Sequence, residues 1–237
     1  RLRYIVPGTN QLHKGWLLLG GAGYYFDTNG LSVKGSQRID GAAYNFNNNF
    51  TLRTGELYWD WAYDGGRLRY VDPNTLDLKK GWLLLNGTGY FFDNNGLSVK
   101  GSQRIDNAAY NFNDNFTLRT GELYWDWAYD GGRLRYVDPG TLNLHKGWLD
   151  MSSARYYFTT DGVTAKGWQQ IGTNYYYFDT ANFFGSTGGQ RIDNVAYNFN
   201  MDGSLRTGEL YWDWAYDGGR LRYIVPGTNQ LHKGWLL

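Results

Sequence analysis

The dipeptide Gly-Trp recurs along this 237-residue chain at a nearly constant interval. It occurs at Gly15, Gly81 and Gly147, which are spaced by 66 residues, and again at Gly167 and Gly234. Further glycines divide each interval into segments of about 20 residues and one longer segment of 26 residues. Such a repeat predicts an array of short units, in which each unit buries its apolar face only by stacking on its neighbours.

The repeats predict one solenoid over residues 1–237. Its units are residues 15–80, 81–146 and 147–233, with a partial unit at each end, and the third unit contains one extra segment. Residues 1–18 are identical to residues 220–237, so the chain opens and closes inside equivalent segments. Terminal repeats normally have atypical capping sequences. We therefore expect the 237 residues to be a fragment of a longer array.

A short segment such as residues 81–101 has the pattern of a β-hairpin. Residues 82–85 are mostly apolar and predict one strand, and residues 90–93 predict the return strand. Between them, Asn86-Gly87 is a dipeptide typical of a two-residue hairpin turn.

The following segment repeats this plan, with strands predicted at 103–105 and 110–112 around a turn at Asp106-Asn107. Helical periodicity does not extend beyond about one turn, and frequent glycine opposes helix formation. A single hairpin is only marginally stable in water. We therefore expect an all-β fold, a solenoid of stacked β-hairpins built from ~20-residue short repeats and 26-residue long repeats.

Composition excludes several classes of protein. Aromatic residues make up 19% of the chain, which is too many for a disordered segment. The 23 Lys and Arg are balanced by 22 Asp and Glu, so no strong field attracts nucleic acid or an anionic membrane. No apolar run approaches the ~20 residues that a membrane helix needs. We expect no nucleic-acid partner and no membrane insertion.

The sequence predicts neither a metal nor a cofactor. Cysteine is absent, which excludes disulfides and thiolate metal sites. The three histidines, His13, His145 and His232, occupy equivalent places in different long segments, too far apart to share a metal. The Asp- and Asn-rich stretches at 93–96 and 113–115 lack the acidic spacing of an EF-hand loop, and turn formation explains them.

The repeated pattern resembles a known family. It runs Gly-Trp, a glycine-containing turn, Tyr-Tyr-Phe-Asp, then a closing Lys-Gly, as in residues 15–35, and residues 167–180 match it closely. This pattern resembles the cell-wall-binding repeats of Gram-positive surface proteins, including choline-binding modules, glucan-binding domains of glucansucrases and C-terminal repeats of clostridial toxins. The resemblance implies an extracellular, cell-surface or cell-wall-associated module that binds polysaccharide.

One position separates the chain from the choline-binding branch. Choline-binding repeats usually place a tryptophan just before the tyrosine pair, where it completes an aromatic cage for a quaternary ammonium. Here that position holds Gly23, Gly89, Arg155 or Tyr175. The alternation of short and long segments looks more like the glucan-binding and toxin arrays. In toxin-like arrays, oligosaccharides are held near the junction of a long and a short repeat.

The 26-residue segments therefore carry the candidate binding residues. Along residues 56–63, strand alternation places Trp59, Trp61 and Tyr63 on one face. Aromatic rings in a row form a platform on which the C–H face of a pyranose stacks, while polar groups fix its hydroxyls. The candidate polar partners are Asp60, Asp64, Arg67 and Arg69, of which the arginines return beside the aromatic strand after a turn at 64–66.

The same segment recurs twice, so each candidate has two counterparts. The candidate glycan-binding residues are Trp59, Trp61, Tyr63, Asp64, Arg67, Trp125, Trp127, Tyr129, Asp130, Arg133, Trp212, Trp214, Tyr216, Asp217 and Arg220.

Aromatic residues in a solenoid also fill its core. We expect the Gly-Trp tryptophans Trp16, Trp82, Trp148 and Trp235 to pack there, because they lie at repeat boundaries beside leucines. For the Trp59 platform, core packing, glycan binding and contact between chains stay open.

Catalysis is not expected. Asp60 and Asp64 are a conceivable glycosidase pair, but a catalytic site is not normally repeated in every turn of an array. The sequence favours a non-catalytic carbohydrate-binding array that attaches its parent protein to cell-wall glycan or exopolysaccharide. The alternative is a structural repeat protein that forms a surface stalk or self-associates into an extracellular filament.

Overall fold

The computed structural model describes residues 1–60, 66–126, 132–152, 154–213 and 220–236. Their contacts divide the chain into two compact units. Unit 1 comprises residues 1–103 and 110–119, and unit 2 comprises residues 104–109 and 120–237. Over the described ranges, no helix is long and apolar enough to cross a membrane.

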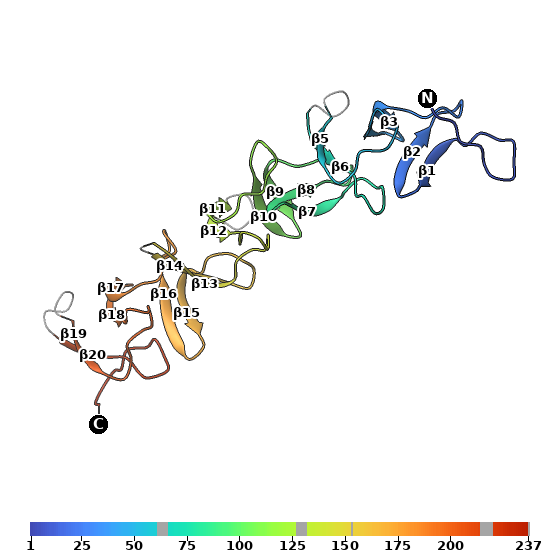
Figure 1. The fold of residues 1–237 in the computed structure, drawn as a ribbon. Coiled ribbons are helices and arrows are strands. Elements are labelled where there is room, and N and C mark those ends of the chain that lie inside the picture. The colour runs from blue at the N-terminus through green and yellow to red at the C-terminus, as the bar shows by residue number, and fades with distance from the viewer. Residues whose placement is uncertain (61–65, 127–131, 153, 214–219, 237) are drawn as a thin grey trace. The chain divides into compact units, whose positions relative to one another are not determined.

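The described residues form twenty strands, paired in chain order as ten two-stranded hairpins (Figure 1). The hairpins are β1–β2 (Gly15–Leu19, Ala22–Phe26), β3–β4 (Gly35–Ile39, Ala42–Phe46), β5–β6 (Leu57–Trp59, Leu68–Tyr70), β7–β8 (Gly81–Leu85, Thr88–Phe92), β9–β10 (Gly101–Ile105, Ala108–Phe112), β11–β12 (Leu123–Asp126, Arg133–Tyr136), β13–β14 (Gly147–Met151, Ala154–Phe158), β15–β16 (Gly167–Ile171, Asn174–Phe178), β17–β18 (Gly188–Ile192, Val195–Phe199) and β19–β20 (Leu210–Asp213, Arg220–Tyr223).

The turn dipeptides form the tight connections that the sequence predicts. Asn86 and Gly87 join β7 to β8 with φ angles of 51° and 77°. Asp106 and Asn107 join β9 to β10 with φ angles of 49° and 65°. Positive φ at both central residues matches the twist of a two-residue hairpin, and Gly, Asn and Asp tolerate it best. The two hairpins predicted from the sequence are therefore confirmed.

Successive hairpins are joined by hydrogen bonds between residues about thirty positions apart. In unit 1, the Leu68 amide donates to Ser98 Oγ at 2.8 Å, and the Ser98 amide donates to the Leu68 carbonyl at 2.9 Å. In unit 2, Leu134 and Thr164 repeat this exchange at 3.1 and 2.9 Å. Thus the return strand of one hairpin binds the loop after the next hairpin, which is the contact that makes the fold a solenoid of stacked hairpins.

The Gly-Trp tryptophans pack between consecutive hairpins. Trp16 on β1 contacts Tyr25 of its own hairpin, and Tyr44 and Phe46 of the next, with ring centroids 4.8–5.9 Å apart. Trp82 and Trp148 repeat this arrangement. Core packing is therefore confirmed for these three. Trp235 differs from the expectation, because it is 94% exposed: the rings that cover the other three come from strands after the tryptophan, and Leu236 is the last described residue.

Candidate functional site

The first strand of each long hairpin presents one tryptophan outward. On β5, Tyr58 is 5% exposed and Asp60, the residue after the strand, is 2% exposed, whereas Trp59 is 47% exposed. Trp125 on β11 and Trp212 on β19 are exposed in the same way. The alternation predicted from the sequence thus holds for these strands. Nine of the candidate residues lie outside the described residues: Trp61, Tyr63, Asp64, Trp127, Tyr129, Asp130, Trp214, Tyr216 and Asp217.

Asp60 and Arg69 form a buried ion pair on the inward face, which corrects their expected role as sugar-binding groups. Arg69 lies across the hairpin from Tyr58, and its Nε is 3.0 Å from Asp60 Oδ2, with both side chains at most 2% exposed. Asp126 and Arg135 form the equivalent pair at 2.8 Å in unit 2. The prediction was wrong because strand alternation turns Asp60 away from Trp59.

Tyr58 fixes the same face to the preceding hairpin. Its hydroxyl donates to the Ala43 carbonyl oxygen at 2.9 Å, and Tyr124 and Tyr211 make the same bond to Ala109 and Ala196. Burial raises the pKa of the Tyr58 hydroxyl well above its ordinary value, because the ionised form loses solvation, and the nearby Arg69 charge offsets only part of this shift.

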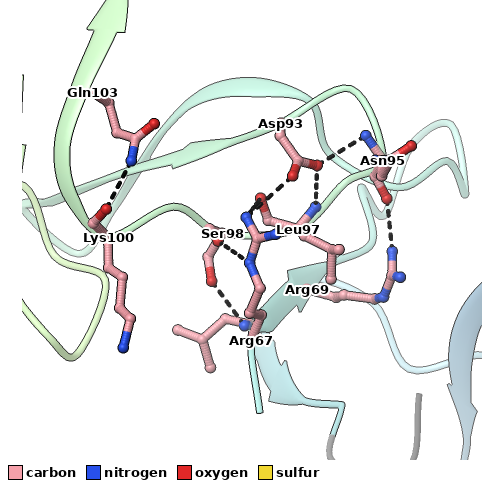
Figure 2. A network of polar contacts seen from close by, with 9 residues as sticks. Arg67, Arg69, Asp93, Asn95, Leu97, Ser98, Lys100 and Gln103 are labelled. Carbon is pink, nitrogen blue, oxygen red and sulfur yellow. Dashed lines mark hydrogen bonds and ion pairs between the residues drawn. The ribbon is translucent and has the colours of Figure 1, made fainter. Parts of the chain in front are cut away.

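Among the described residues of unit 1, Arg67 is the sequence-predicted polar residue that lies beside Trp59. Its Nε donates to the Ser98 carbonyl at 2.7 Å, and its terminal nitrogen donates to Asp93 Oδ2 at 3.1 Å and to the Leu97 carbonyl at 3.3 Å (Figure 2). About a third of the side chain stays exposed. Arg67 therefore holds the loop that follows β8 and also faces solvent beside the tryptophan.

Trp59 and Arg67 line an open depression of about 620 Å³, which we call the Trp59 cleft. Its walls come from three hairpins of unit 1, because the loops after β8 and β10 fold back beside β5. Gln103 donates to the Lys100 carbonyl at 2.8 Å (Figure 2). The lining residues are Trp59, Gly66, Arg67, Asp93, Val99, Lys100, Gln103, Asp114 and Phe116.

Most of these lining residues were missed by sequence reasoning. Asp93, Lys100, Gln103, Asp114 and Phe116 follow Trp59 by 34 to 57 positions, and no local pattern joins them to it. The one available signal was the resemblance to toxin-like arrays, which directed attention to the junction of a long and a short repeat.

Buried Phe116 supports the exposed tryptophan from below. The centroids of Trp59 and Phe116 are 5.5 Å apart with their planes at 71°, and Phe116 is 4% exposed. Trp125 and Phe183 make the same edge-to-face contact at 5.5 Å and 68° in unit 2. The backbones of Phe116 and Phe183 have φ angles of 69° and 65°, a region that a bulky residue occupies only when its surroundings hold it there.

Unit 2 carries a second copy of this arrangement, which we call the Trp125 site. Residues 55–73 and 121–139 are identical, so Trp125 and Arg133 correspond to Trp59 and Arg67. Gln169 donates to the Lys166 carbonyl at 3.0 Å, as Gln103 does to Lys100. Trp212, at 62% exposure, has no comparable phenylalanine contact among the described residues.

The histidines have a structural role. Nε2 of His13, His145 and His232 each lies 2.9–3.0 Å from the carbonyl oxygen of the Gly-Trp tryptophan three residues later. His145 Nδ1 also lies 2.9 Å from Asp138 Oδ1. Within the described ranges, no group of His, Cys, Asp and Glu has the arrangement of a metal site.

Arg155 occupies the position where choline-binding repeats usually carry a tryptophan. Its guanidinium carbon lies 4.3 Å from the centroid of Trp148, and its Nε lies 3.0 Å from Asp150 Oδ1. The chain therefore places its own cation on this aromatic face. At the equivalent Gly23, the space of a side chain is taken by Leu76 and Leu52, whose carbons would lie 2.8–3.4 Å from an added Cβ.

A family model described as a putative cell wall binding repeat matches residues 166–181. Glucosyltransferase-S of Streptococcus downei is 29% identical over 159 residues, which cover 66% of this chain. Toxin A of Clostridium novyi is 30% identical over 109 residues, which cover 42% of this chain. The modular autolysin LytC from Streptococcus pneumoniae has a similar fold, with a TM-score of 0.59 and 18% identity over 93% of this chain and 49% of that chain.

These matches span 11% of the length of the glucosyltransferase and 5% of that of the toxin. The fold likeness to the autolysin confirms a repeat solenoid of hairpins, and the matched repeat and both relatives agree with the resemblance noted in the sequence. Residues 166–181 thus match the cell-wall-binding repeat, and longer parts of the chain are similar to parts of a streptococcal glucosyltransferase and a clostridial toxin.

Proposed function

We propose that the chain is a non-catalytic, extracellular carbohydrate-binding array that attaches its parent protein to cell-wall glycan or exopolysaccharide. The Trp59 cleft carries this proposal, because it combines an exposed indole with amide and charged groups from three hairpins. An exposed aromatic surface with polar groups at its rim is typical of an interaction site.

The cleft offers complementary chemistry to each part of a sugar ring. The face of Trp59 provides the apolar surface on which the C–H groups of a pyranose stack. The Gln103 amide and the carboxylates of Asp93 and Asp114 accept hydrogen bonds from hydroxyls, and Arg67 and Lys100 donate them. None of these groups needs to change its covalent state, so the chemistry supports binding.

The tandem copies fit a polymer better than a small molecule. The cleft is open and shallow, so a single site would hold only a short stretch of sugar with low affinity. A polysaccharide that reaches the Trp59 cleft and the Trp125 site raises its own effective concentration at the second site after binding the first. Relatives that include a glucosyltransferase support an α-glucan as the first polymer to test.

The test removes the outward tryptophans together. We expect the variant Trp59→Ala, Trp125→Ala, Trp212→Ala to bind dextran at least about tenfold more weakly, because buried aromatic contacts dominate recognition energies. Retention on immobilised dextran and on purified Gram-positive cell walls measures the loss, and circular dichroism checks folding.

The control variant is Leu18→Ala with Leu84→Ala, which removes large exposed side chains (60% and 49% exposed) from the short hairpins instead. We expect this control to bind like the parent chain. Unchanged dextran and cell-wall retention by the folded tryptophan variant would refute the assignment of the site.

A second candidate function is structural, and the exposed leucines of the short hairpins favour it. Leu18, Leu19 and Leu84 are each 49–60% exposed, which gives apolar surface on which a second copy of the chain could pack. A surface stalk or filament predicts assembly that increases with concentration. Analytical ultracentrifugation of the Leu18→Ala, Leu84→Ala variant beside the parent chain separates this role from glycan binding.

A further inference from the structure

The Trp59 cleft and the Trp125 site differ in charge. In the Trp59 cleft, the cations Arg67 and Lys100 are balanced by the carboxylates of Asp93 and Asp114. Both cations have counterparts in the Trp125 site, namely Arg133 and Lys166. Neither Asp93 nor Asp114 has an acidic residue at the equivalent position.

Thr159 replaces Asp93 without changing the loop. The amides of Asp93 and Thr159 each donate to the carbonyl four residues later at 2.9 Å, so the two side chains leave equivalent backbone positions. Asp93 binds Arg67 at 3.1 Å. Thr159 instead donates its hydroxyl to the Val163 carbonyl at 3.2 Å and carries no charge for Arg133.

The second carboxylate is lost in the loop that ends at the buried phenylalanine. Asp114 lies in the loop Asn113–Phe116, and the corresponding loop Asp179–Phe183 is one residue longer and has Thr180 and Ala181 at this place. Asp179 itself corresponds to Asn113. Its carboxylate accepts the amides of residues 181 and 182 at 2.8 and 2.7 Å, and it lines a different depression, beside Arg155.

Arg67 and Arg133 also differ in the number of hydrogen bonds that they donate to other residues of the protein. Arg67 donates to two carbonyls and to Asp93 over 2.7–3.3 Å. Among the described residues, Arg133 makes a single long contact of this kind, to the Thr164 carbonyl at 3.5 Å. The guanidinium of Arg133 therefore has more capacity for an anionic ligand than that of Arg67.

The two segments that lie outside the described residues have the same charge. Residues 61–65 and 127–131 are identical in sequence, so Asp64 and Asp130 add the same charge to each copy. The equivalent loops carry the same number of carboxylates but at different positions: Asp161 takes the place of Asn95, which lines a separate depression, and Asp179 takes the place of Asn113. What the Trp125 site lacks is a carboxylate at the positions of Asp93 and Asp114.

We propose that the Trp125 site selects acidic glycans, with carboxylate-bearing sugars as its ligand class, whereas the Trp59 cleft takes neutral sugars. This inference rests on the proposed function, because it assigns a ligand class to each of its sites. A planar carboxylate on a pyranose stacked against Trp125 meets Arg133 and Lys166, and the guanidinium fork matches its two oxygens. In the Trp59 cleft the same group meets Asp93 and Asp114.

The experiment isolates each site in the full chain. Trp125→Ala with Trp212→Ala leaves the Trp59 cleft, and Trp59→Ala with Trp212→Ala leaves the Trp125 site. Both chains are titrated with dextran and with carboxymethyl dextran of the same length. We expect the chain that retains the Trp125 site to prefer the carboxymethyl form by about fivefold at low salt, as two partly exposed charge contacts allow. The other chain should show no preference.

Adding a carboxylate to the Trp125 site tests whether its missing charge causes the preference for the carboxymethyl form. Thr159→Asp, added to the chain that retains the Trp125 site, should abolish the preference while dextran binding stays. Thr160→Asp is the matched control, because it adds the same charge one residue away, at a position whose counterpart Asn94 lines a separate depression. We expect this control to keep the preference.

The outcomes separate the two proposals. If both isolated sites bind dextran but show equal preference, or if Thr160→Asp acts as strongly as Thr159→Asp, the charge inference is wrong and glycan binding stands. If both folded chains bind neither polymer, glycan binding itself is refuted, and the inference with it.

Discussion

Trp82 and Trp59 each lie on the first strand of a hairpin in unit 1, but the hairpins that follow cover their indole rings to different extents. Tyr110 and Phe112 of the next hairpin pack on Trp82, with centroids 4.8 and 6.1 Å away. Trp59 receives the edge of Phe116 and stays 47% exposed. The same residue type thus serves the core or the surface according to what the next hairpins place over it.

The strongest test of this comparison acts on the inward face beneath Trp59. Arg69→Met leaves the Asp60 carboxylate buried without its guanidinium partner, and breaking such a pair costs about 3–5 kcal/mol of folding free energy. Urea denaturation followed by circular dichroism measures the loss. Arg53→Met is the control, because it breaks a solvent-exposed pair with Glu56 and should cost less than about 1 kcal/mol. Equal losses of folding free energy in the two variants would show that the buried ion pair stabilises the long hairpin no more than the exposed pair does.

The direct test compares the two tryptophans. Trp82→Ala should lower the free energy of unfolding by about 3 kcal/mol, because it removes a ring packed among three others. Trp59→Ala should cost about 1 kcal/mol or less, since much of its surface already faces water. Both values come from urea titrations. A similar cost for the two variants would mean that Trp59 is a core residue, and its role as a sugar platform would be lost.

The smallest effect concerns Tyr58, the inward neighbour of Trp59. Burial raises its pKa in the folded state above the ordinary value of 10.0, so the folded state holds the proton more tightly than the unfolded state. Its contribution to stability is therefore complete below pH 10 and is lost as the pH rises beyond it.

Tyr58→Phe should reduce that alkaline loss and cost about 1 kcal/mol at neutral pH, where it removes the bond to the Ala43 carbonyl. Thermal unfolding between neutral pH and pH 11 measures both effects. Tyr24→Phe is the comparison variant, because Tyr24 is only partly buried on β2. A parent chain whose stability does not change above pH 10 would contradict this assignment.

The local elements follow from short-range patterns. Asn86-Gly87 and Asp106-Asn107 predict their turns because few residues accept positive φ, and the alternation around Trp59 predicts which side chains point inward. The expectation for Asp60 failed although alternation already placed it opposite Trp59. Its partner Arg69 becomes visible only when the register of β5 and β6 is known.

The sequence by itself determined a repeated array of hairpins, the inward and outward faces of the long strands and the tryptophans that carry the proposed function. Only the tertiary structure decided which residues share a site. Asp93, Lys100, Asp114 and Phe116 line one cleft with Trp59 because hairpins stack with their loops folded back over preceding strands. Turn and strand preferences act over a few residues, whereas a stacking contact joins positions 30 or more apart, and no local preference encodes that distance.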